Sequence, residues 1–499
     1  MIRKDTMLSY TAFALLIVLM GLFSLHTLGS IYQDIGRHIT MGRVIWETGS
    51  VPQVNLFSYT APDFPFVNHH WLGGLVLYFG DRLLGLQALI VVKALLVACA
   101  FGLSLAAAWC SRVVVPAIAI GVASLYTMVE RTDVRPEILS FVFLGWFLFV
   151  LYRKPHSKFL WTLPVVQALW VNTHIYFFMG PVLVVAWWIG EIGRSGRSAL
   201  AGRRHWLFTG LVALATFMNP AGYHGAFYPL TMWSNYGYSI AENKNLFFLH
   251  AYGYPIMTSV AFGCVAVLTS LSFVFNVRNL RKNIDSLFLF IVTLGLALAM
   301  TRNFPLIALS AMPITLRNML ESGWRARPRT GIAMALLFLS LMGVSIVTNQ
   351  IYTQAGIGGR NFDTYVPDAH ERPIEFYRTA GIRGPIFNNF DIGSYLIWKL
   401  PEEPVFIDGR PEAYPASFIQ DVYIRMQEDA TVWAEQSKKY GINAIFWSYY
   451  DMTPWSQVFV GRIAKDPEWV TVYHARGIMI LVKNTPENAL IIAQHRISQ

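Results

Sequence analysis

Long apolar segments recur along most of this chain, and they constrain its fold more than any other feature. A helix needs about 20 apolar residues to cross a bilayer. Such segments are expected near residues 8–29, 86–109, 113–128, 136–152, 159–172, 175–191, 206–219, 255–275, 284–300, 303–316 and 331–349. The first follows a basic N-terminus and is long enough for a retained signal anchor. The pattern predicts a membrane all-α bundle of about eleven transmembrane helices.

Charge is scarce in this chain and unevenly placed. Only 14% of the 499 residues are charged, against about a quarter in soluble domains. The net charge of +10 comes largely from Lys and Arg in alternate short loops. Because positive loops stay on the cytoplasmic side, we expect a multi-pass protein of the bacterial inner membrane. Its N-terminus would be cytoplasmic and its C-terminal domain periplasmic, with membrane lipids rather than nucleic acid as partners.

Hydropathy falls near residue 350, which predicts two domains. Residues 1–349 form the transmembrane domain, which includes a long, structured first outer loop over 30–85. That loop is expected to hold an amphipathic helix over 39–47 and an interfacial helix over 71–84. Residues 350–499 are expected to form a soluble, extracytoplasmic α/β domain. Its predicted strands lie near 385–387, 404–408, 443–447 and 470–473, and its predicted helices near 371–380 and 431–440.

Ionisable residues gather at the ends of spans on the outer side. Such residues are functional candidates because a charge at membrane depth is costly. This outer set comprises Asp34, Arg37, His38, His69, His70, Glu130, Arg131, Asp133, Arg135, Glu137 and Arg302. Arginine forks onto phosphate oxygens, and a carboxylate can take a proton from a hydroxyl. The combination favours a lipid phosphate that carries a sugar as the substrate.

The acidic residues of this set are candidates for catalysis. Asp34 is the favoured general base, and its alternative role is to cap the helix that follows it. Glu130 and Asp133 are further catalytic candidates, beside Arg131 and Arg135 as candidate phosphate ligands. The alternative for that group is a salt-bridge cluster that ties two helix ends together.

Other residues are candidates for substrate binding. Arg37 and His38 follow Asp34 and could contact the substrate phosphate. Arg302 could bind phosphate or extend to lipid headgroups. His174 could line the cleft or satisfy carbonyls at a helix end. All four predictions rest on placement at the outer ends of spans.

Two further groups each have a structural alternative. His69 and His70 could hold a divalent metal such as Mg, Mn or Zn, although adjacent histidines point in different directions and could simply make hydrogen bonds. Asp408 and Arg410 could bind the acceptor, or form an internal pair within a buried turn. No cofactor other than a metal is indicated.

Several segments together resemble bacterial GT-C membrane glycosyltransferases, in particular the lipid A aminoarabinose and protein mannosyl transferases. The resembling segments are 34–38, 54–60, 67–72, 135–137, 170–174, 219–220, 228–229, 302–305, 389–398 and 406–410. The resemblance implies a GT-C-like fold and an inverting hexosyl- or pentosyltransferase that uses a polyprenyl-phosphate sugar. It also implies Asp34 as the base and a second acidic site at Glu130 or Asp133. His70 stands where related proteins often carry a glutamate, which leaves metal dependence open.

These features lead to one leading hypothesis and two alternatives. The leading hypothesis is a membrane glycosyltransferase that moves a sugar from a polyprenyl-phosphate donor to an envelope glycan, lipid or protein acceptor. The reaction would take place on the outer face of the inner membrane. One alternative is a catalytically inactive scaffold that binds other envelope-assembly proteins. The other is a transporter of lipid-linked substrates, which fits less well because few ionisable groups lie in mid-span.

Overall fold

The polypeptide folds into two units of different secondary structure. The computed structural model describes residues 2–28, 34–233, 236–251, 253, 256–324, 329–354, 360–366 and 371–497. The helical unit comprises Met1–Leu28, Leu83–Pro229 and Ile240–Tyr365, and the mixed unit comprises Gly29–Arg82, Leu230–Ser239 and Val366–Gln499. Residues 30–33 of the predicted first loop lie outside the described part. The domain boundary at residue 349 stays a prediction, while the contacts group residues 29–82 with the C-terminal residues.

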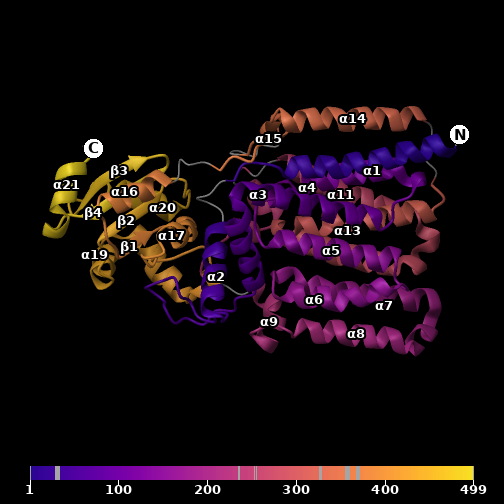
Figure 1. Ribbon diagram of the computed structural model, residues 1–499, viewed down its shortest axis with the longest axis horizontal. Helices are drawn as coiled ribbons and strands as arrows, with labels where there is room; N and C mark the ends of the chain where they lie inside the picture. The colour runs from indigo at the N-terminus through magenta and orange to yellow at the C-terminus, as the bar shows by residue number, and fades with distance from the viewer. Residues whose placement is uncertain are drawn as a thin grey trace. The chain divides into compact units, whose positions relative to one another are not determined.

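Each apolar segment that the sequence predicts as a helix coincides with a helix of the structure. These helices are α1 (Ile2–Ser24), α3 (Trp71–Ala106), α4 (Val114–Thr127), α5 (Glu137–Arg153), α6 (Leu163–Val171), α7 (Met179–Ser195), α8 (Arg203–Thr216), α11 (Ile256–Phe275), α12 (Ile284–Ala299), α13 (Phe304–Glu321) and α14 (Arg329–Val347). The short helices α9 (Gly222–Phe227), α10 (Leu246–His250) and α15 (Gln350–Gln354) connect them. The long helices lie alongside one another (Figure 1). The predicted all-α bundle is therefore confirmed.

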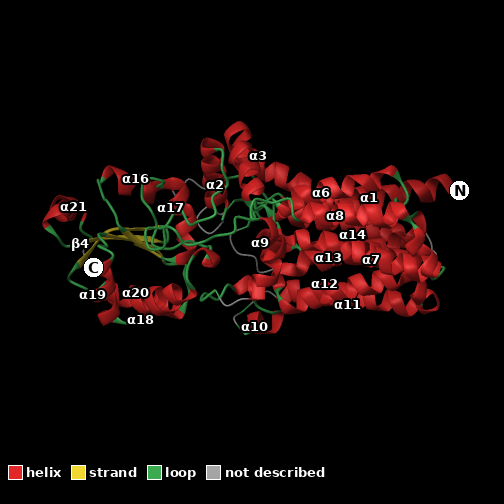
Figure 2. Cartoon of the chain, turned by 90° about the horizontal axis from the view of Figure 1, so that it is seen from below, coloured by secondary structure: helices red, strands yellow, loops and turns green. Residues whose placement is uncertain are grey.

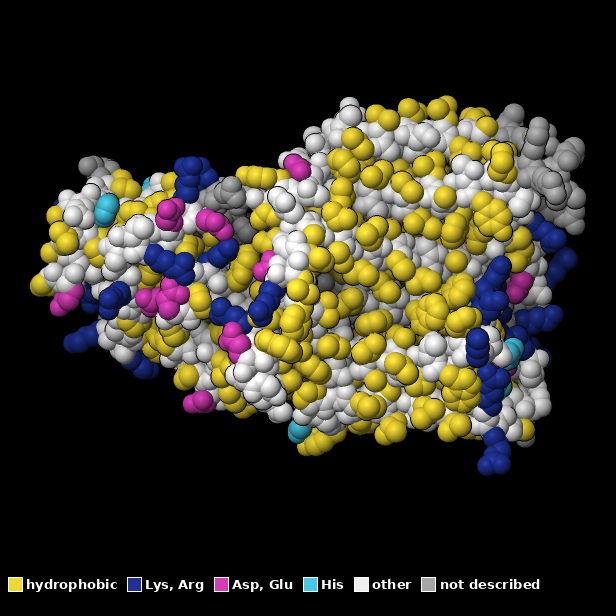
Figure 3. All heavy atoms as spheres, in the orientation of Figure 1, with side chains coloured by type: hydrophobic (Ala, Val, Ile, Leu, Met, Phe, Trp, Pro, Cys, Tyr) yellow, Lys and Arg dark blue, Asp and Glu magenta, His cyan; other side chains and the backbone are white. Residues whose placement is uncertain are grey.

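Helix length and surface composition both identify a membrane bundle. Among the described residues, five helices are long and apolar enough to cross a membrane: Thr6–Ser24, Trp71–Ala106, Ile175–Ser195, Ile256–Phe275 and Val277–Ala299. Shorter apolar helices are Ser111–Thr127, Lys158–Val171 and Ile332–Val347. Figure 3 shows hydrophobic side chains over the visible face of the helical unit, with Lys and Arg gathered at one end of its helices. So large an apolar surface requires a lipid environment. The number of eleven spans and the orientation stay predictions.

Helix α3 is broken at a single glycine. Gly85 has φ 80° and ψ 165°, a conformation that a residue with a side chain rarely adopts. The break separates residues 71–84 from the apolar run that follows. The sequence predicts this division, because Asp81 and Arg82 interrupt the hydropathy there.

The mixed unit is built on a four-stranded sheet of order β1-β2-β4-β3. Its strands are β1 (Ile386–Asn388), β2 (Ala444–Ser448), β3 (Trp469–Ala475) and β4 (Ile478–Lys483). β1 and β2 are parallel, whereas β4 runs antiparallel to β2 and β3. Figure 2 shows helices α16 (Glu371–Thr379), α17 (Gly393–Lys399) and α21 (Ala489–His495) on one side of the sheet. On the other side lie α18 (Arg425–Glu428), α19 (Ala430–Lys439) and α20 (Pro454–Ile463).

Both faces of the central part of this sheet are buried, so its strands are mostly apolar. Side chains alternate between faces along a strand. In β2, Ala444 and Phe446 join the core with α16, α17 and α21, whereas Ile445 and Trp447 join the core with α19 and α20. The predicted α/β domain is confirmed, including strands near 385–387, 443–447 and 470–473.

One strand prediction is wrong and one strand escapes prediction. Residues 404–408 do not join the sheet: Val405 forms an isolated bridge with Ser58, and its N–H donates to the Phe57 carbonyl at 2.9 Å. β4 pairs with β3 through a tight turn in which Arg476 and Gly477 both have positive φ. Local apolarity cannot distinguish a buried sheet strand from a buried extended segment, because both exclude water equally.

The predicted first outer loop shares a core with the C-terminal sheet. Helix α2 (Ile35–Thr48) forms as predicted, and its Met41 and Ile45 pack in one buried cluster with Phe406 and Trp447. A Cβ on Gly36 would lie 2.8 Å from Trp398 Cβ on α17, so only glycine permits this close packing of α2 on α17. The C-terminal fold is thus completed by residues from near the N-terminus.

Candidate functional site

A cavity of about 170 Å³ lies inside the helical unit. Three segments that are far apart in sequence form its wall: the end of α4 with the following turn, the segment before α10, and the residues before α13. The lining residues are Thr127, Glu130, Arg131, Ala241, Glu242, Leu249, Thr301, Arg302 and Phe304. Of the predicted site residues, Glu130, Arg131 and Arg302 therefore meet at one hollow.

Arg131 lies in the 3₁₀ turn Val129–Arg131 and is held by two carboxylates. It pairs with Glu137 at the start of α5, and its Nη1 lies 2.6 Å from Glu242 Oε2. Burial alone would lower the pKa of Arg131, but Glu137 and Glu242 raise that pKa well above its usual value. The Arg131 Nε has no hydrogen-bond partner in the described part of the chain. Arg131 is thus a cation whose position at the cavity is fixed by Glu137 and Glu242.

Glu242 joins the predicted arginines, and sequence reasoning did not select it. Its Oε1 accepts from Arg135 Nη1 at 3.0 Å. Burial would raise the pKa of Glu242, but Arg131, Arg135 and Arg302 together hold it below its ordinary value. The only sequence signal for Glu242 is its place in a long outer loop over 220–254, a length typical of functional loops.

Arg302 is the cavity guanidinium whose charge no direct ion pair offsets among the described residues. Its Nη1 donates to Asn243 Oδ1 at 2.8 Å, and its Nε has no partner in the described part. Tyr176 OH donates to the Arg302 carbonyl at 2.6 Å. His174 in turn supports Tyr176, whose N–H donates to His174 Nδ1 at 3.4 Å. The hydrogen bond from Tyr176 therefore fixes the backbone of Arg302 at the cavity. His174 contributes indirectly, through its hydrogen bond with Tyr176.

Glu130 and Asp133 have different surroundings, although both are predicted catalytic residues. Glu130 lines the cavity and accepts from Thr258 Oγ1 at 3.3 Å. Asp133 Oδ2 accepts from Arg360 Nη2 at 2.9 Å, and its Oδ1 lies 3.9 Å from His26 Nε2. Burial would raise the pKa of Asp133, but the Arg360 guanidinium holds it below its ordinary value. Asp133 thus belongs to a buried ion pair with Arg360, a residue outside the predicted salt-bridge cluster.

Sequence reasoning also missed the basic residues behind Asp133. Lys93 on α3 is 3% exposed, and its Nζ lies 3.3 Å from His26 Nε2. His26 also contacts the Thr132 hydroxyl at 3.1 Å. Their positions alone could have identified them as functional candidates. Lys93 lies inside the apolar helix α3 and His26 follows the apolar helix α1, and ionisable residues at such positions are costly in lipid.

Asp34 lies in the mixed unit, at the N-terminal end of α2. It occupies the N-cap position, but its side chain makes no capping hydrogen bond. Instead its Oδ1 accepts from Arg37 Nε at 3.2 Å and from Ser394 Oγ on α17 at 3.5 Å. The capping alternative is therefore wrong. The carboxylate remains 30% exposed, so a substrate hydroxyl can reach it.

The histidine rings of the first loop lie close to one another in tilted and edge-on arrangements. The ring centres of His69 and His70 are 3.8 Å apart, and those of His38 and His70 are 5.3 Å apart. His69 Nδ1 lies 3.1 Å from the Val67 carbonyl. No group of three or more His, Cys, Asp or Glu side chains in the described ranges could hold a metal. The residues present do not fit the predicted divalent metal site.

Asp408 and Arg410 form the internal pair that the sequence leaves as one of two possibilities. Arg410 Nε and Nη2 each lie 2.7 Å from an Asp408 oxygen, and both side chains are buried. Nη2 also donates to Asn55 Oδ1 in the first loop at 3.0 Å. The pair therefore joins the loop to the C-terminal sheet.

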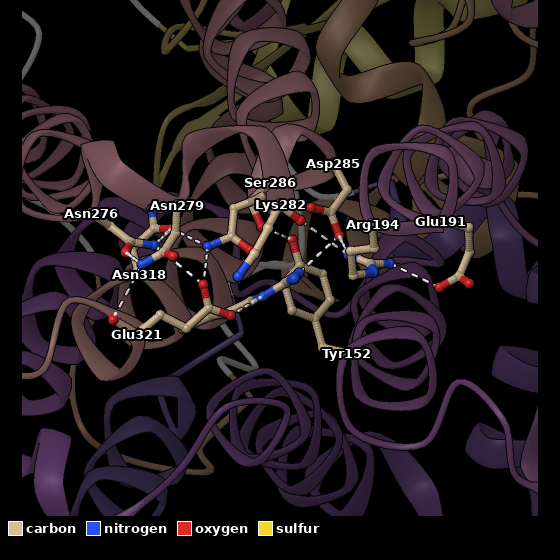
Figure 4. Close-up of polar contacts among 12 residues, drawn as sticks. Tyr152, Glu191, Arg194, Asn276, Asn279, Lys282, Asp285, Ser286, Asn318 and Glu321 are labelled. Atoms are coloured by element: carbon tan, nitrogen blue, oxygen red, sulfur yellow. Dashed lines mark hydrogen bonds and ion pairs between the residues drawn. The ribbon is translucent and has the colours of Figure 1, made fainter. Parts of the chain in front are cut away.

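A second polar network joins α7, α12 and α13 in the helical unit, near the end of α13 that lies away from the cavity (Figure 4). Asp285 Oδ2 accepts from Arg194 at 3.2 Å and from Arg317 at 2.8 Å, and Glu321 accepts from Arg317 at 3.1 Å. The residues drawn with labels are Tyr152, Glu191, Arg194, Asn276, Asn279, Lys282, Asp285, Ser286, Asn318 and Glu321. Because its carboxylates pair with arginines across α7, α12 and α13, this network ties helices together.

Comparison with known proteins supports the fold. No protein-family model matches the chain, and no curated protein does. The structure resembles the Archaeoglobus fulgidus oligosaccharyltransferase AglB, solved with an inhibitory peptide and a dolichol-phosphate, at a TM-score of 0.57 and 11% identity. The match covers 98% of this chain and 77% of AglB. AglB in its apo form matches at a TM-score of 0.52 and 10% identity, over 97% of this chain and 75% of its own.

A bacterial structure gives the same result. ArnT from Cupriavidus metallidurans, bound to undecaprenyl phosphate, matches at a TM-score of 0.50 and 14% identity, over 99% of both chains. Identities this low establish a common fold and leave activity open. AglB and ArnT are both membrane glycosyltransferases of the GT-C superfamily. The chain therefore has the fold of the GT-C membrane glycosyltransferases, as its sequence motifs predict.

Proposed function

We propose that this protein is an inverting membrane glycosyltransferase that uses a polyprenyl-phosphate sugar donor. The observation that carries the proposal is the cavity in a GT-C fold whose lining includes the guanidinium residues Arg302 and Arg131. A guanidinium is well suited to phosphate, because its planar donors match the phosphate oxygens. AglB and ArnT were solved with a dolichol-phosphate and with undecaprenyl phosphate, respectively.

Arg302 is the cavity cation that favours an anionic ligand. The cavity and the adjoining ion pairs contain four basic residues, Arg131, Arg135, Arg302 and Arg360, and four acidic residues, Glu130, Asp133, Glu137 and Glu242. A phosphate would pair with Arg302, which makes no ion pair among the described residues. Fixed cations of this kind stabilise the charge that develops on a leaving phosphate, since they need no reorientation during the reaction.

In this proposal Asp34 is the general base. Its carboxylate takes the proton from an acceptor hydroxyl, and that oxygen forms a bond to the anomeric carbon of the sugar. The bond from the anomeric carbon to the phosphate oxygen breaks, and the lipid phosphate leaves with the electron pair. One displacement inverts the anomeric configuration. Arg37, at 3.2 Å from Asp34, orients the carboxylate.

The finer details are part of the proposal. We place the reaction on the outer face of the bacterial inner membrane, with a glycan, lipid or protein as acceptor. Arg135 acts through Glu242, and His174 through Tyr176, so both support the phosphate site rather than contact the ligand. The proposed reaction uses no metal ion, because His69 and His70 do not belong to a group of three or more possible metal ligands among the described residues.

Phosphate binding and proton transfer are tested separately. Full-length protein in nanodiscs is titrated with undecaprenyl phosphate. Arg302→Gln should weaken binding roughly 10- to 100-fold, the value of one or more charge-assisted hydrogen bonds. The control Arg112→Gln changes an exposed arginine at the other end of the helices and should leave binding unchanged. Equal affinity in wild type and Arg302→Gln would exclude this phosphate site.

Asp34→Asn tests the transferase reaction in cells. The variant should accumulate to wild-type levels, bind undecaprenyl phosphate normally and lose one envelope glycan modification. The control Asp363→Asn replaces an aspartate of the helical unit whose side chain, among the described residues, accepts from the backbone amides of Thr364 and Tyr365 in its own turn. Wild-type glycans in the Asp34→Asn strain, with normal protein levels, would refute the assignment.

A further inference from the structure

The segment of residues 360–365 is fixed within the helical unit. Thr27 N–H, just after α1, donates to the Asn361 carbonyl at 2.9 Å, and Leu28 N–H donates to the Tyr365 carbonyl at 3.4 Å. Phe362 N–H donates to Asn349 Oδ1 at 2.6 Å. These bonds give the segment a defined place beside the end of α1. Arg360 is its first described residue.

The Arg360 side chain donates hydrogen bonds to three acceptors in one short turn, residues 129–133. Its Nη1 donates to the Val129 carbonyl, and its Nη2 donates to the Glu130 carbonyl at 3.1 Å. Nη2 also donates to Asp133 Oδ2 at 2.9 Å. Side chains of Arg360 and Asp133 are 13% and 12% exposed, so water competes little for these bonds.

Arg360 is a donor to the turn over 129–133 from outside it. The turn follows the C-cap of α4, where carbonyls lack partners within the helix; within the turn, the Val129 carbonyl also accepts from the Thr132 hydroxyl at 3.1 Å. A guanidinium at such an end satisfies the carbonyls and also complements the helix dipole. The same turn presents the side chains of Glu130 and Arg131 to the cavity. Whatever fixes its backbone therefore fixes those two side chains.

We propose that Arg360 is a positioning residue, which fixes the turn over 129–133 and so sets Arg131 and Glu130 at the cavity. This role explains why the Asp133 carboxylate is engaged away from the cavity: it orients the Arg360 fork. The effect on phosphate affinity rests on the proposed function, whereas the effect on the turn does not. A lysine could reach Asp133 but could not serve both carbonyls, because it lacks the planar fork.

Hydrogen exchange in the full-length protein tests the position of the turn directly. Arg360→Ala should speed exchange of the amides of residues 129–133 at least 10-fold, and Arg360→Lys should give an intermediate rate. Arg360→Ala should also weaken binding of undecaprenyl phosphate at least 10-fold. A second variant combines Arg360→Ala with Asp133→Asn. It leaves no unpaired carboxylate at residue 133, so we expect the protein to stay folded while the amides of the turn exchange faster. The control Arg153→Ala removes an arginine-to-carbonyl bond to Trp109 at the opposite helix ends, and it should change neither quantity.

The outcomes separate the two proposals. Faster exchange confined to the turn, together with weaker binding, supports both. Faster exchange in a protein whose wild type binds no undecaprenyl phosphate supports the positioning role and refutes the phosphate site. The positioning role would be overturned if amide exchange at residues 129–133 stayed within twofold of wild type both in Arg360→Ala and in Arg360→Ala with Asp133→Asn. A uniform rise across the whole helical unit in both variants would overturn it as well, because it would report only lost stability.

Discussion

Replacing Arg410 by Met should strongly destabilise the mixed unit, because the change leaves the Asp408 carboxylate buried without its cation. The two side chains are 2% and 0% exposed. Arg410 donates twice to Asp408 at 2.7 Å and once to Asn55 at 3.0 Å. In the variant, Tyr414 OH at 2.8 Å would be the one remaining side-chain donor to Asp408 among the described residues.

The size of the effect follows from the burial of the pair. Removing one partner of a buried ion pair costs about 3–5 kcal/mol. In a unit of this size, each kcal/mol lowers Tm by roughly 2–4 °C, so we expect a fall of roughly 6–20 °C. The double variant Asp408→Asn, Arg410→Met removes both charges. It should recover most of the loss, because no uncompensated charge then remains.

Hydrogen exchange of β2 measures this loss in the full-length protein. The amides of Ala444–Ser448 lie in the centre of the sheet, so their exchange reports the opening of the mixed unit. The matched control is Arg378→Met, whose ion pair with Glu402 has both side chains 52% exposed. Such an exposed pair contributes about 0–1 kcal/mol.

Two results would contradict this reasoning. One is an Arg410→Met variant whose β2 exchange matches that of Arg378→Met. The other is a double variant whose loss equals the sum of the two single losses, since that would show no coupling between the charges.

Two further predictions concern the helical unit. Burial lowers the pKa of His26 to about 3, so the folded protein keeps this histidine neutral while the unfolded chain binds a proton below about pH 6.5. Stability should fall by roughly 2 kcal/mol from this group between pH 7 and pH 5, and His26→Asn should flatten the pH dependence of hydrogen exchange; equal slopes would contradict the prediction. Asp285→Ala should lower the free energy of unfolding by about 1–3 kcal/mol, because Arg194 and Arg317 lose a shared acceptor. Asp285→Asn should lose less in thermal melts, and an equal loss would show that the hydrogen bonds are unimportant.

The helices could be predicted because their cause is local. Each transmembrane helix satisfies its backbone hydrogen bonds within one continuous segment. Apolar runs such as 255–275 and 284–300 therefore mark α11 and α12 directly. The break at Gly85 is visible for the same reason, since Asp81 and Arg82 interrupt the run beside it.

The candidate site could be predicted only in part. Residue type and placement identified Arg131, Arg302 and Glu130, which the fold brings to one cavity. They could not identify Glu242 or Arg360, because each becomes relevant only through a partner more than 100 residues away. Strand pairing could not be predicted for the same reason. The local sequence of residues 404–408 resembles that of a sheet strand, although these residues do not join the sheet.

The sequence by itself determined a membrane helical bundle and a mixed C-terminal fold, and it predicted a polar set at one end of the helices. Tertiary structure alone decided which carboxylate meets which guanidinium. It paired Asp133 with Arg360, left Arg302 without an ion pair among the described residues, and gave Asp34 its Ser394 neighbour. The physical reason is range. Helix formation depends on neighbours within one turn, whereas an ion pair depends on where the whole chain places two distant residues.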